Sequence, residues 1–192
     1  AIASEALDMG FAEVQWDYVR FPDVTASQRQ SMVYPGSGDV TREDNIQQFL
    51  AYSKEHLRRY RVPITADVFG LVTYMDGDVG IGQNWEKVIT TADVVLPMVY
   101  PSHYYAGMYG FQAPNAHPYE IIRISMQDAV ERTRPVYAVG GRAGEIIPWL
   151  QAFTADYLRD GLTYGASQLR NHIQATYDSG LKSWVLCNPA TS

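Results

Sequence analysis

The sequence is poor in cysteine, histidine and positive charge. Its one cysteine, Cys187, excludes an internal disulfide and any metal site built from several cysteines. The four histidines, at positions 56, 103, 117 and 172, show neither the HxxxH nor the HExxH spacing of metal sites, and we expect no metal or other cofactor. A net charge of -6 gives no basic surface for nucleic acid or for an anionic membrane.

Long hydrophobic runs and several common enzyme motifs are also missing. No apolar run is long enough to span a bilayer, and no secretory signal pattern opens the chain. There is no GxSxG elbow and no phosphate-binding glycine-lysine loop, and the glycines at 140–144 lack dinucleotide spacing and predict a plain loop. The compartment stays open, and a secreted or cell-envelope location is compatible with the lack of disulfides.

Aromatic residues, in contrast, are abundant. They make up 12% of the 192 residues, with 14 tyrosines and 4 tryptophans, and hydrophobic residues make up 46%. This composition predicts a globular protein, and the length suits one domain over residues 1–192. Aromatic side chains fill cores, but they also form platforms for sugar rings.

The stretch Gly10–Pro22 organises the chain. Strand alternation places Glu13, Gln15 and Asp17 on one face, and the residues between them on the other. One interpretation is a barrel strand whose last inward carboxylate reaches the C-terminal rim, where barrel enzymes do their chemistry. The other is an antiparallel edge strand with a solvent-facing polar row.

Strand-like and helix-like segments alternate along the chain. Strands are predicted at 11–19, 63–70, 92–100 and 183–188. One further strand is predicted at either 136–139 or 146–153, and the second segment is favoured. Helices are predicted at 1–9, 41–60, 84–90, 118–132 and 167–178, with a long loop at 22–43. Strands separated by helices without hairpin signals predict an α/β fold with a parallel sheet.

Six motifs in order resemble the glycoside-hydrolase-like DUF4015 family. They are Trp16–Pro22, with Trp16 in place of a usual Phe, Thr65–Gly70, Ile81–Glu86, Pro97–Tyr104, Pro148–Gln151 and Trp184–Asn188. The resemblance covers nearly the whole chain. It implies a (β/α)₈ TIM barrel akin to the α-amylase-type glycosidases, here a partial barrel corresponding to about strands 4 to 8.

Two departures from the family pattern accompany this resemblance. Family domains begin with about three further βα units, and Ala152 and Cys187 stand where an Asp and a Trp are usual. A partial barrel leaves two open sheet edges, which are prone to association. We therefore expect either a homo-oligomer or a missing N-terminal half to cover these edges.

Two carboxylates are candidates for catalysis. Glycoside hydrolysis needs two carboxyl groups beside the scissile bond, and Asp17 and Asp67 end adjacent predicted strands. By analogy with amylase-like barrels, Asp17 would be the nucleophile and Asp67 the acid/base. The structural alternative is that one Asp caps a turn while the other pairs with Arg20. Asp76 or Asp78 in the following loop could instead supply the acid.

Six further residues are expected to bind the substrate. Arg20 could orient the Asp17 carboxylate or form a surface ion pair, and the others follow strands on the same rim. Glu13 and Gln15 are expected to form a buried polar layer, and Trp16 to lie in the core. The predicted substrate-binding residues are Arg20, Tyr100, His103, Tyr104, Trp149 and Gln151.

The sequence therefore predicts a hydrolase that cleaves O-glycosidic bonds of a polysaccharide with retention of configuration. The alternative is a carbohydrate-binding module without turnover, or an inactive barrel fragment.

Overall fold

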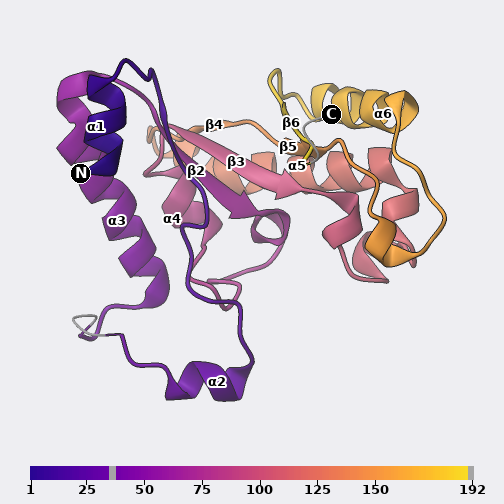
Figure 1. Cartoon of the computed structure of the whole chain (residues 1–192), viewed down its shortest axis with the longest axis horizontal. Coiled ribbons are helices and arrows are strands. Elements are labelled where there is room, and N and C mark those ends of the chain that lie inside the picture. Colours follow the sequence, from indigo (N-terminus) through magenta and orange to yellow (C-terminus); the bar gives the residue numbers. More distant parts are fainter. Residues whose placement is uncertain (35–37, 190–192) are drawn as a thin grey trace.

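The computed structural model describes residues 1–34 and 38–189, and in this part of the chain six strands form one parallel sheet (Figure 1). Each strand pairs with its neighbour in chain order, except that β4 and β5 both pair with β3. The strands are β1 (Val14–Trp16), β2 (Ile64–Phe69), β3 (Val94–Val99), β4 (Glu145–Ile146), β5 (Trp149–Gln151) and β6 (Val185–Cys187).

β4 and β5 lie end to end along β3 and together fill one strand position. β4 pairs with Val94 and Val95, and β5 pairs with Met98 and Val99. Pro148 stands between them and has no N–H to donate to a neighbouring strand. The sheet therefore has five strand positions in a curled, open half-barrel, which confirms the predicted partial barrel of the α/β class.

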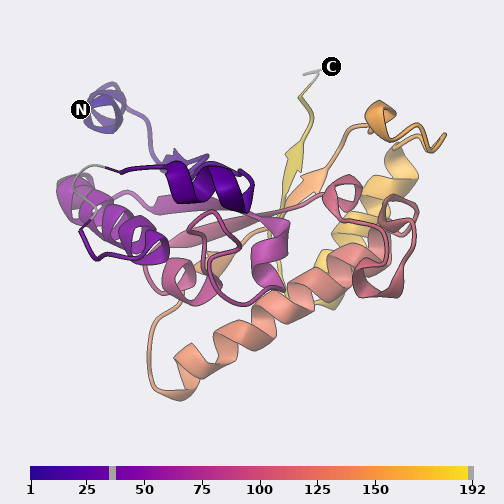
Figure 2. The same cartoon turned by 90° about the horizontal axis from the view of Figure 1, so that it is seen from below.

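Helices cover one face of this sheet. Figure 2 shows the long helix α5 running beneath the strands. The strand residues on this face are Ala66, Val68, Val95, Val99 and Leu150, and they share one core with Leu50, Trp85, Met126 and Ala175 of four helices. The helices are α1 (Ile2–Asp8), α2 (Ala26–Ser31), α3 (Arg42–Leu57), α4 (Trp85–Ile89), α5 (Pro118–Ala138) and α6 (Ala166–Asp178).

Short 3₁₀ turns connect many of these elements. They are found at Arg58–Tyr60, Gly70–Thr73, Pro101–His103, Met108–Gly110, Pro114–Ala116 and Asp156–Leu158. Of these, Gly70–Thr73 and Pro101–His103 directly follow the C-terminal ends of β2 and β3. Within residues 1–34 and 38–189, no helix has the length and apolarity needed to cross a membrane.

Most predicted elements are present, one predicted loop differs, and two pairs of alternatives are decided. Residues 136–138 extend α5, so the favoured alternative, 146–153, holds the fourth strand position. The predicted loop at 22–43 contains α2, which begins with a capping box between Thr25 and Gln28. The antiparallel alternative for Gly10–Pro22 is wrong, since β1 pairs with β2 in parallel.

The face opposite the helices is concave and open. Glu13 and Gln15 lie on this face and are exposed, so the buried polar layer expected from them is wrong. The reason is that β1 is an edge strand with β2 on one side only, and nothing in the described chain covers its inner face. Trp16 points the other way, as predicted, and donates from Nε1 to Ser53 Oγ of α3 at 2.8 Å.

Candidate active site

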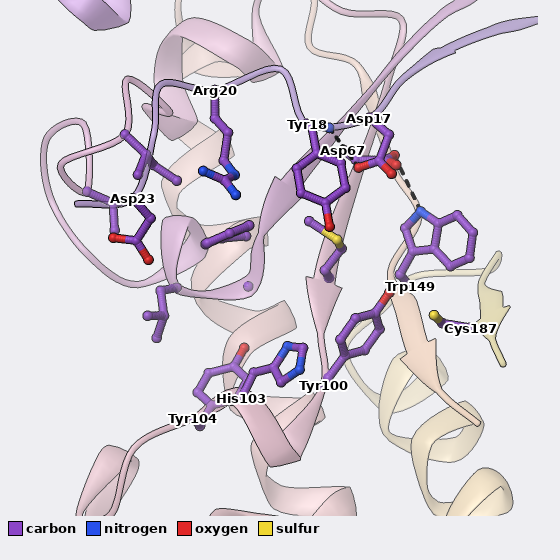
Figure 3. Close-up of a pocket in the computed structure, with 16 residues that line it drawn as sticks. Asp17, Tyr18, Arg20, Asp23, Asp67, Tyr100, His103, Tyr104, Trp149 and Cys187 are labelled. Atoms are coloured by element: carbon purple, nitrogen blue, oxygen red, sulfur yellow. Dashed lines mark hydrogen bonds between the residues drawn. The ribbon is translucent and has the colours of Figure 1, made fainter. Parts of the chain in front are cut away.

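A cavity of about 590 Å³ opens at the C-terminal ends of the strands, on the concave face (Figure 3). Alternate residues of neighbouring strands point into it because parallel pairing puts them in register, for example Phe69 opposite Met98 and Met98 opposite Trp149. It is lined by Asp17, Tyr18, Arg20, Asp23, Asp67, Phe69, Gly70, Leu71, Val79, Ile81, Met98, Tyr100, His103, Tyr104, Trp149 and Cys187.

Asp67 is the buried carboxylate of this cavity. It lies within β2, and only 2% of its surface is exposed. Its Oδ2 accepts from Gln15 Nε2 at 2.7 Å, and its Oδ1 accepts from Trp149 Nε1 at 3.4 Å. Burial raises the pKa of Asp67 to about 6, and the charge of Asp17 adds to the rise, whereas the hydrogen bonds from Gln15 and Trp149 oppose it. Asp67 therefore exchanges its proton close to neutral pH.

Asp17 is the exposed carboxylate beside it. β1 and β2 pair Trp16 with Ala66, so the next position along each strand brings Asp17 alongside Asp67. Figure 3 shows the two carboxyl groups together at the mouth of the cavity. Asp17 Oδ1 accepts from the backbone N–H of the next residue, Tyr18, at 2.7 Å. The site thus holds two carboxyl groups in different environments, the arrangement that separates an acid from an ionised partner.

Gln83 fixes the strand that carries Asp67, a role that the strand pattern did not predict. This side chain is 1% exposed and stands in the loop between β2 and α4. Its Nε2 donates to the carbonyl oxygens of Asp67 at 3.1 Å and Val19 at 3.3 Å, and its Oε1 accepts from Phe69 N–H at 2.9 Å. The one sequence signal for it is its place in the motif Ile81–Glu86.

Tyr100, His103 and Tyr104 line the opposite side of the cavity. Tyr100 is buried, and burial together with its contact to Cys187 raises the pKa of its hydroxyl. Burial lowers the pKa of His103, which favours the neutral imidazole. Tyr104 contributes its ring, because its hydroxyl is held by Ser125 Oγ of α5 at 2.8 Å.

Trp149 and Gln151 share a strand face but not an environment. Trp149 lines the cavity and reaches Asp67. Gln151 is fully buried outside the lining, where its Oε1 accepts from Ser102 N–H at 3.1 Å and its Nε2 donates to the Phe153 carbonyl at 3.0 Å. The structure therefore does not bring Gln151 to a substrate, because the chain after β5 turns over it.

Of the remaining predicted site residues, Arg20 lines the cavity, whereas Asp76 and Asp78 do not. Arg20 lines the cavity but forms no ion pair with Asp17 or Asp67 in the described structure, so neither the orienting contact nor the surface ion pair expected for it is present. Asp78 pairs with Arg42 at 2.8 Å, outside the cavity lining, and Asp76 is exposed outside it as well. Tyr18 and Asp23 are lining residues that the sequence did not single out.

Metal binding has no candidate in the described part of the chain. Among residues 1–34 and 38–189, no group of three or more His, Cys, Asp or Glu side chains is arranged to hold an ion.

Comparison with known protein families identifies the family of this chain. A family model described as "putative glycosyl hydrolase domain" matches residues 1–192. The chain belongs to the DUF4015 family. The description of this family names a putative glycosyl hydrolase domain, and the match includes every residue of the cavity. A search of curated proteins finds no match to this DUF4015 chain.

Among solved structures, this DUF4015 chain is similar to bee venom hyaluronidase, determined in complex with a hyaluronic acid tetramer. The two share 13% sequence identity with a TM-score of 0.47. The match covers 74% of this chain and 44% of the hyaluronidase chain, so the DUF4015 chain spans less than half of that enzyme's length.

The raised pKa of Asp67 predicts a pH-dependent stability. In an unfolded chain the carboxyl ionises near pH 3.9, whereas in the fold it ionises near pH 6. Between these values the unfolded state loses the proton first, so stability falls as pH rises and levels off above about pH 6. The Asp67→Asn variant has no carboxyl group to ionise at this position and should not show this loss. We therefore expect its free energy of unfolding, relative to that of the native chain, to rise by about 2–3 kcal/mol when the pH is raised from 4 to 7.5.

Urea unfolding of both proteins at the two pH values measures this gain. Asp76→Asn is the matched control, because this exposed residue lies outside the cavity, and its effect should stay within about 0.5 kcal/mol. A stability difference for Asp67→Asn that is the same at both pH values would contradict the prediction.

Proposed function

We propose that this protein is a glycoside hydrolase that cleaves O-glycosidic bonds of a polysaccharide with retention of anomeric configuration. The observation that carries the proposal is the buried Asp67, with a pKa near 6, beside the exposed Asp17. Asp67 donates its proton to the leaving-group oxygen, and the Asp17 carboxylate attacks the anomeric carbon. Asp67 then takes a proton from the water that releases the sugar.

The strand register supports retention over inversion. Neighbouring strands lie about 4.8 Å apart, and retaining enzymes hold their carboxyl groups about 5–5.5 Å apart, whereas inverting enzymes need about 6.5–9.5 Å. Since Asp17 and Asp67 follow paired positions of β1 and β2, they suit the shorter separation. Trp149 supports the proposal further, because it offers a ring for a sugar face beside the carboxyl that it contacts.

We also propose that the two edge strands of the sheet, β1 and β6, are covered in the functional protein. β1 and β6 each pair on one side only among the described strands. A second copy of the chain, or further βα units preceding this stretch, would cover these edges and complete the wall of the cavity.

The experiment is a screen for released reducing ends over a panel of polysaccharides, on a sample whose mass is known from light scattering. Asp67→Asn serves as the inactive control, and proton NMR of the first product gives its anomer. Activity of the native chain with a retained anomer supports the proposal. An inverted anomer contradicts retention. Binding without released ends, on a well-folded sample, would instead favour the carbohydrate-binding alternative.

A further inference from the structure

The guanidinium of Arg20 lies in the cavity without a carboxylate partner. Its Nη1 donates to the carbonyl oxygen of Phe21 at 3.1 Å, and its Nε is buried with no acceptor. Among the described residues, no ion pair includes Arg20. A guanidinium carries five N–H donors, so most of its donor capacity is unused by the protein.

Three other partly buried cations of the chain are neutralised, whereas Arg29, whose Nε is also buried without an acceptor, forms no ion pair among the described residues. Arg42 pairs with Asp78 at 2.8 Å, Lys87 pairs with Glu43 at 3.0 Å, and Arg132 pairs with Glu86 at 2.7 Å. Withdrawing a charge from water costs free energy unless a partner compensates it. Arg20 differs from all four because it lines the cavity, where a ligand can supply the partner.

Two aromatic rings hold this side chain in place. The guanidinium carbon lies 5.2 Å from the centre of the Tyr18 ring and 5.1 Å from the centre of the Phe69 ring. Contact with ring faces favours the cation and leaves the N–H groups at the edge of its plane available. Such an edge matches the two oxygens of a carboxylate.

The backbone supports the same arrangement. Tyr18 has a φ of 53°, in the left-handed region that a tyrosine seldom adopts, and Arg20 N–H bonds back to the Tyr18 carbonyl at 2.7 Å. Phe21 N–H is then fixed to the Ile81 carbonyl at 2.7 Å. This turn directs both Tyr18 and Arg20 to the cavity, at the cost of local strain, which is a feature of functional sites.

Arg20 is set apart from the carboxylate pair. In Figure 3, the Tyr18 ring stands between the guanidinium and the carboxyl groups of Asp17 and Asp67. The partner of Arg20 is therefore a group displaced from the scissile bond. Asp23 is the other charged group on this side of the cavity, and it is exposed to solvent, which screens its repulsion of an anion.

We propose that the substrate is an acidic glycan, and that Arg20 binds the carboxylate of a uronic acid residue in it. This inference rests on the proposed function of the same cavity. The free donors and the missing counterion favour a planar anion, the two aromatic contacts hold the guanidinium ready for it, and a uronate is a sugar that carries such an anion.

The test compares ligands that differ in the carboxylate alone. Oligosaccharides of galacturonate, of mannuronate and of a glucuronate-containing glycan are each paired with their carboxyl-reduced forms. Binding is measured by calorimetry on full-length Asp67→Asn, so that turnover does not interfere, and hydrolysis is measured on the native chain. We expect at least one acidic ligand to bind about tenfold tighter than its reduced partner, with a preference that weakens as salt rises.

Variants of Arg20 identify the group that causes this preference. Arg20→Gln should reduce it to less than about twofold, and Arg20→Lys should leave an intermediate value because an ammonium lacks the planar fork. Arg58→Gln is the matched control, since it removes one positive charge from an exposed residue beyond α3, and it should leave the preference unchanged. Thermal unfolding confirms that each variant is folded.

Each outcome decides between the two proposals. Equal binding of acidic and reduced ligands, no binding of any of them, or a preference that survives Arg20→Gln overturns the acidic-glycan inference. Hydrolysis of neutral glycans alone would overturn it while leaving the proposed hydrolase function intact. An Arg20-dependent preference without any hydrolysis would support the acidic site and overturn the hydrolase.

Discussion

Asp17→Ala is expected to lower kcat by about 10⁴-fold or more, the scale on which loss of a nucleophile acts, and sodium azide is expected to restore part of the rate. The cavity left by the carboxylate admits azide, which attacks the anomeric carbon from the same side as Asp17. The product is a glycosyl azide with inverted configuration, which NMR identifies. Asp17 is exposed, so the truncation should leave the fold intact.

Replacing Asp67 should lower the rate in a way that depends on the leaving group. Asp67→Asn should lower the rate about 10²–10⁴-fold on natural glycosides, because the leaving oxygen then departs without a proton. On aryl glycosides with acidic phenols, which need no proton to leave, the loss should be much smaller. The native rate should also fall as pH rises above about 6, following the pKa of Asp67. Equal losses on both leaving groups, or an Asp17→Ala variant that keeps a tenth of the native rate, would contradict this assignment.

Gln83→Leu is expected to have the largest effect on stability. The leucine keeps the volume but leaves three buried backbone groups without partners: the carbonyls of Val19 and Asp67 and the N–H of Phe69. An unpaired buried polar group costs about 1–3 kcal/mol, so for three such groups we expect a loss of at least about 3 kcal/mol in the free energy of unfolding. Denaturant unfolding measures it.

Gln83→Leu should also change catalysis through Asp67. Once the backbone of β2 is released, Asp67 becomes better solvated, so the alkaline limb of the pH–rate profile should move to lower pH while KM changes little. Gln47→Leu is the control, because Gln47 makes one long hydrogen bond, 3.3 Å to Thr91 Oγ1, and it should cost less than about 1 kcal/mol. A destabilised Gln83→Leu variant with an unshifted profile would assign Gln83 to the fold alone.

Much of the sheet could be predicted because its signals are local. The apolar runs that became β2 and β3 are bounded by Pro63, Gly70 and Pro101, and Asp67 and Trp149 were expected at one rim because each lies near the C-terminal end of a predicted strand. The capping box of Thr25 and Gln28 is also a local signal, since the Thr-x-x-Gln spacing is a helix-start signature, although it lies inside the predicted loop at 22–43.

The remaining features depend on contacts between distant segments. Gln151 has the inward parity of Trp149, yet the chain beyond β5 covers it, and no periodicity reports the path of a loop. Gln83 stands in a glycine-containing loop and acts on backbone atoms 14 and more positions away, which alternation cannot reveal. The missing counterion of Arg20 is likewise a property of the folded cavity, because Asp17 and Asp23 are near it in sequence and neither forms an ion pair with it.

The side chains that line this cavity stand on two kinds of backbone. Asp67 and Trp149 belong to strands of the hydrogen-bonded sheet, whereas Tyr18, Arg20 and Asp23 belong to the connection that leads from β1 to α2. Connections accept sequence changes that strands do not. For protein engineering, we therefore expect the side chains at positions 18, 20 and 23 to be exchangeable, whereas Val19, which is buried in the core and bonded to Gln83, and Phe21, which packs against that core, have to be kept.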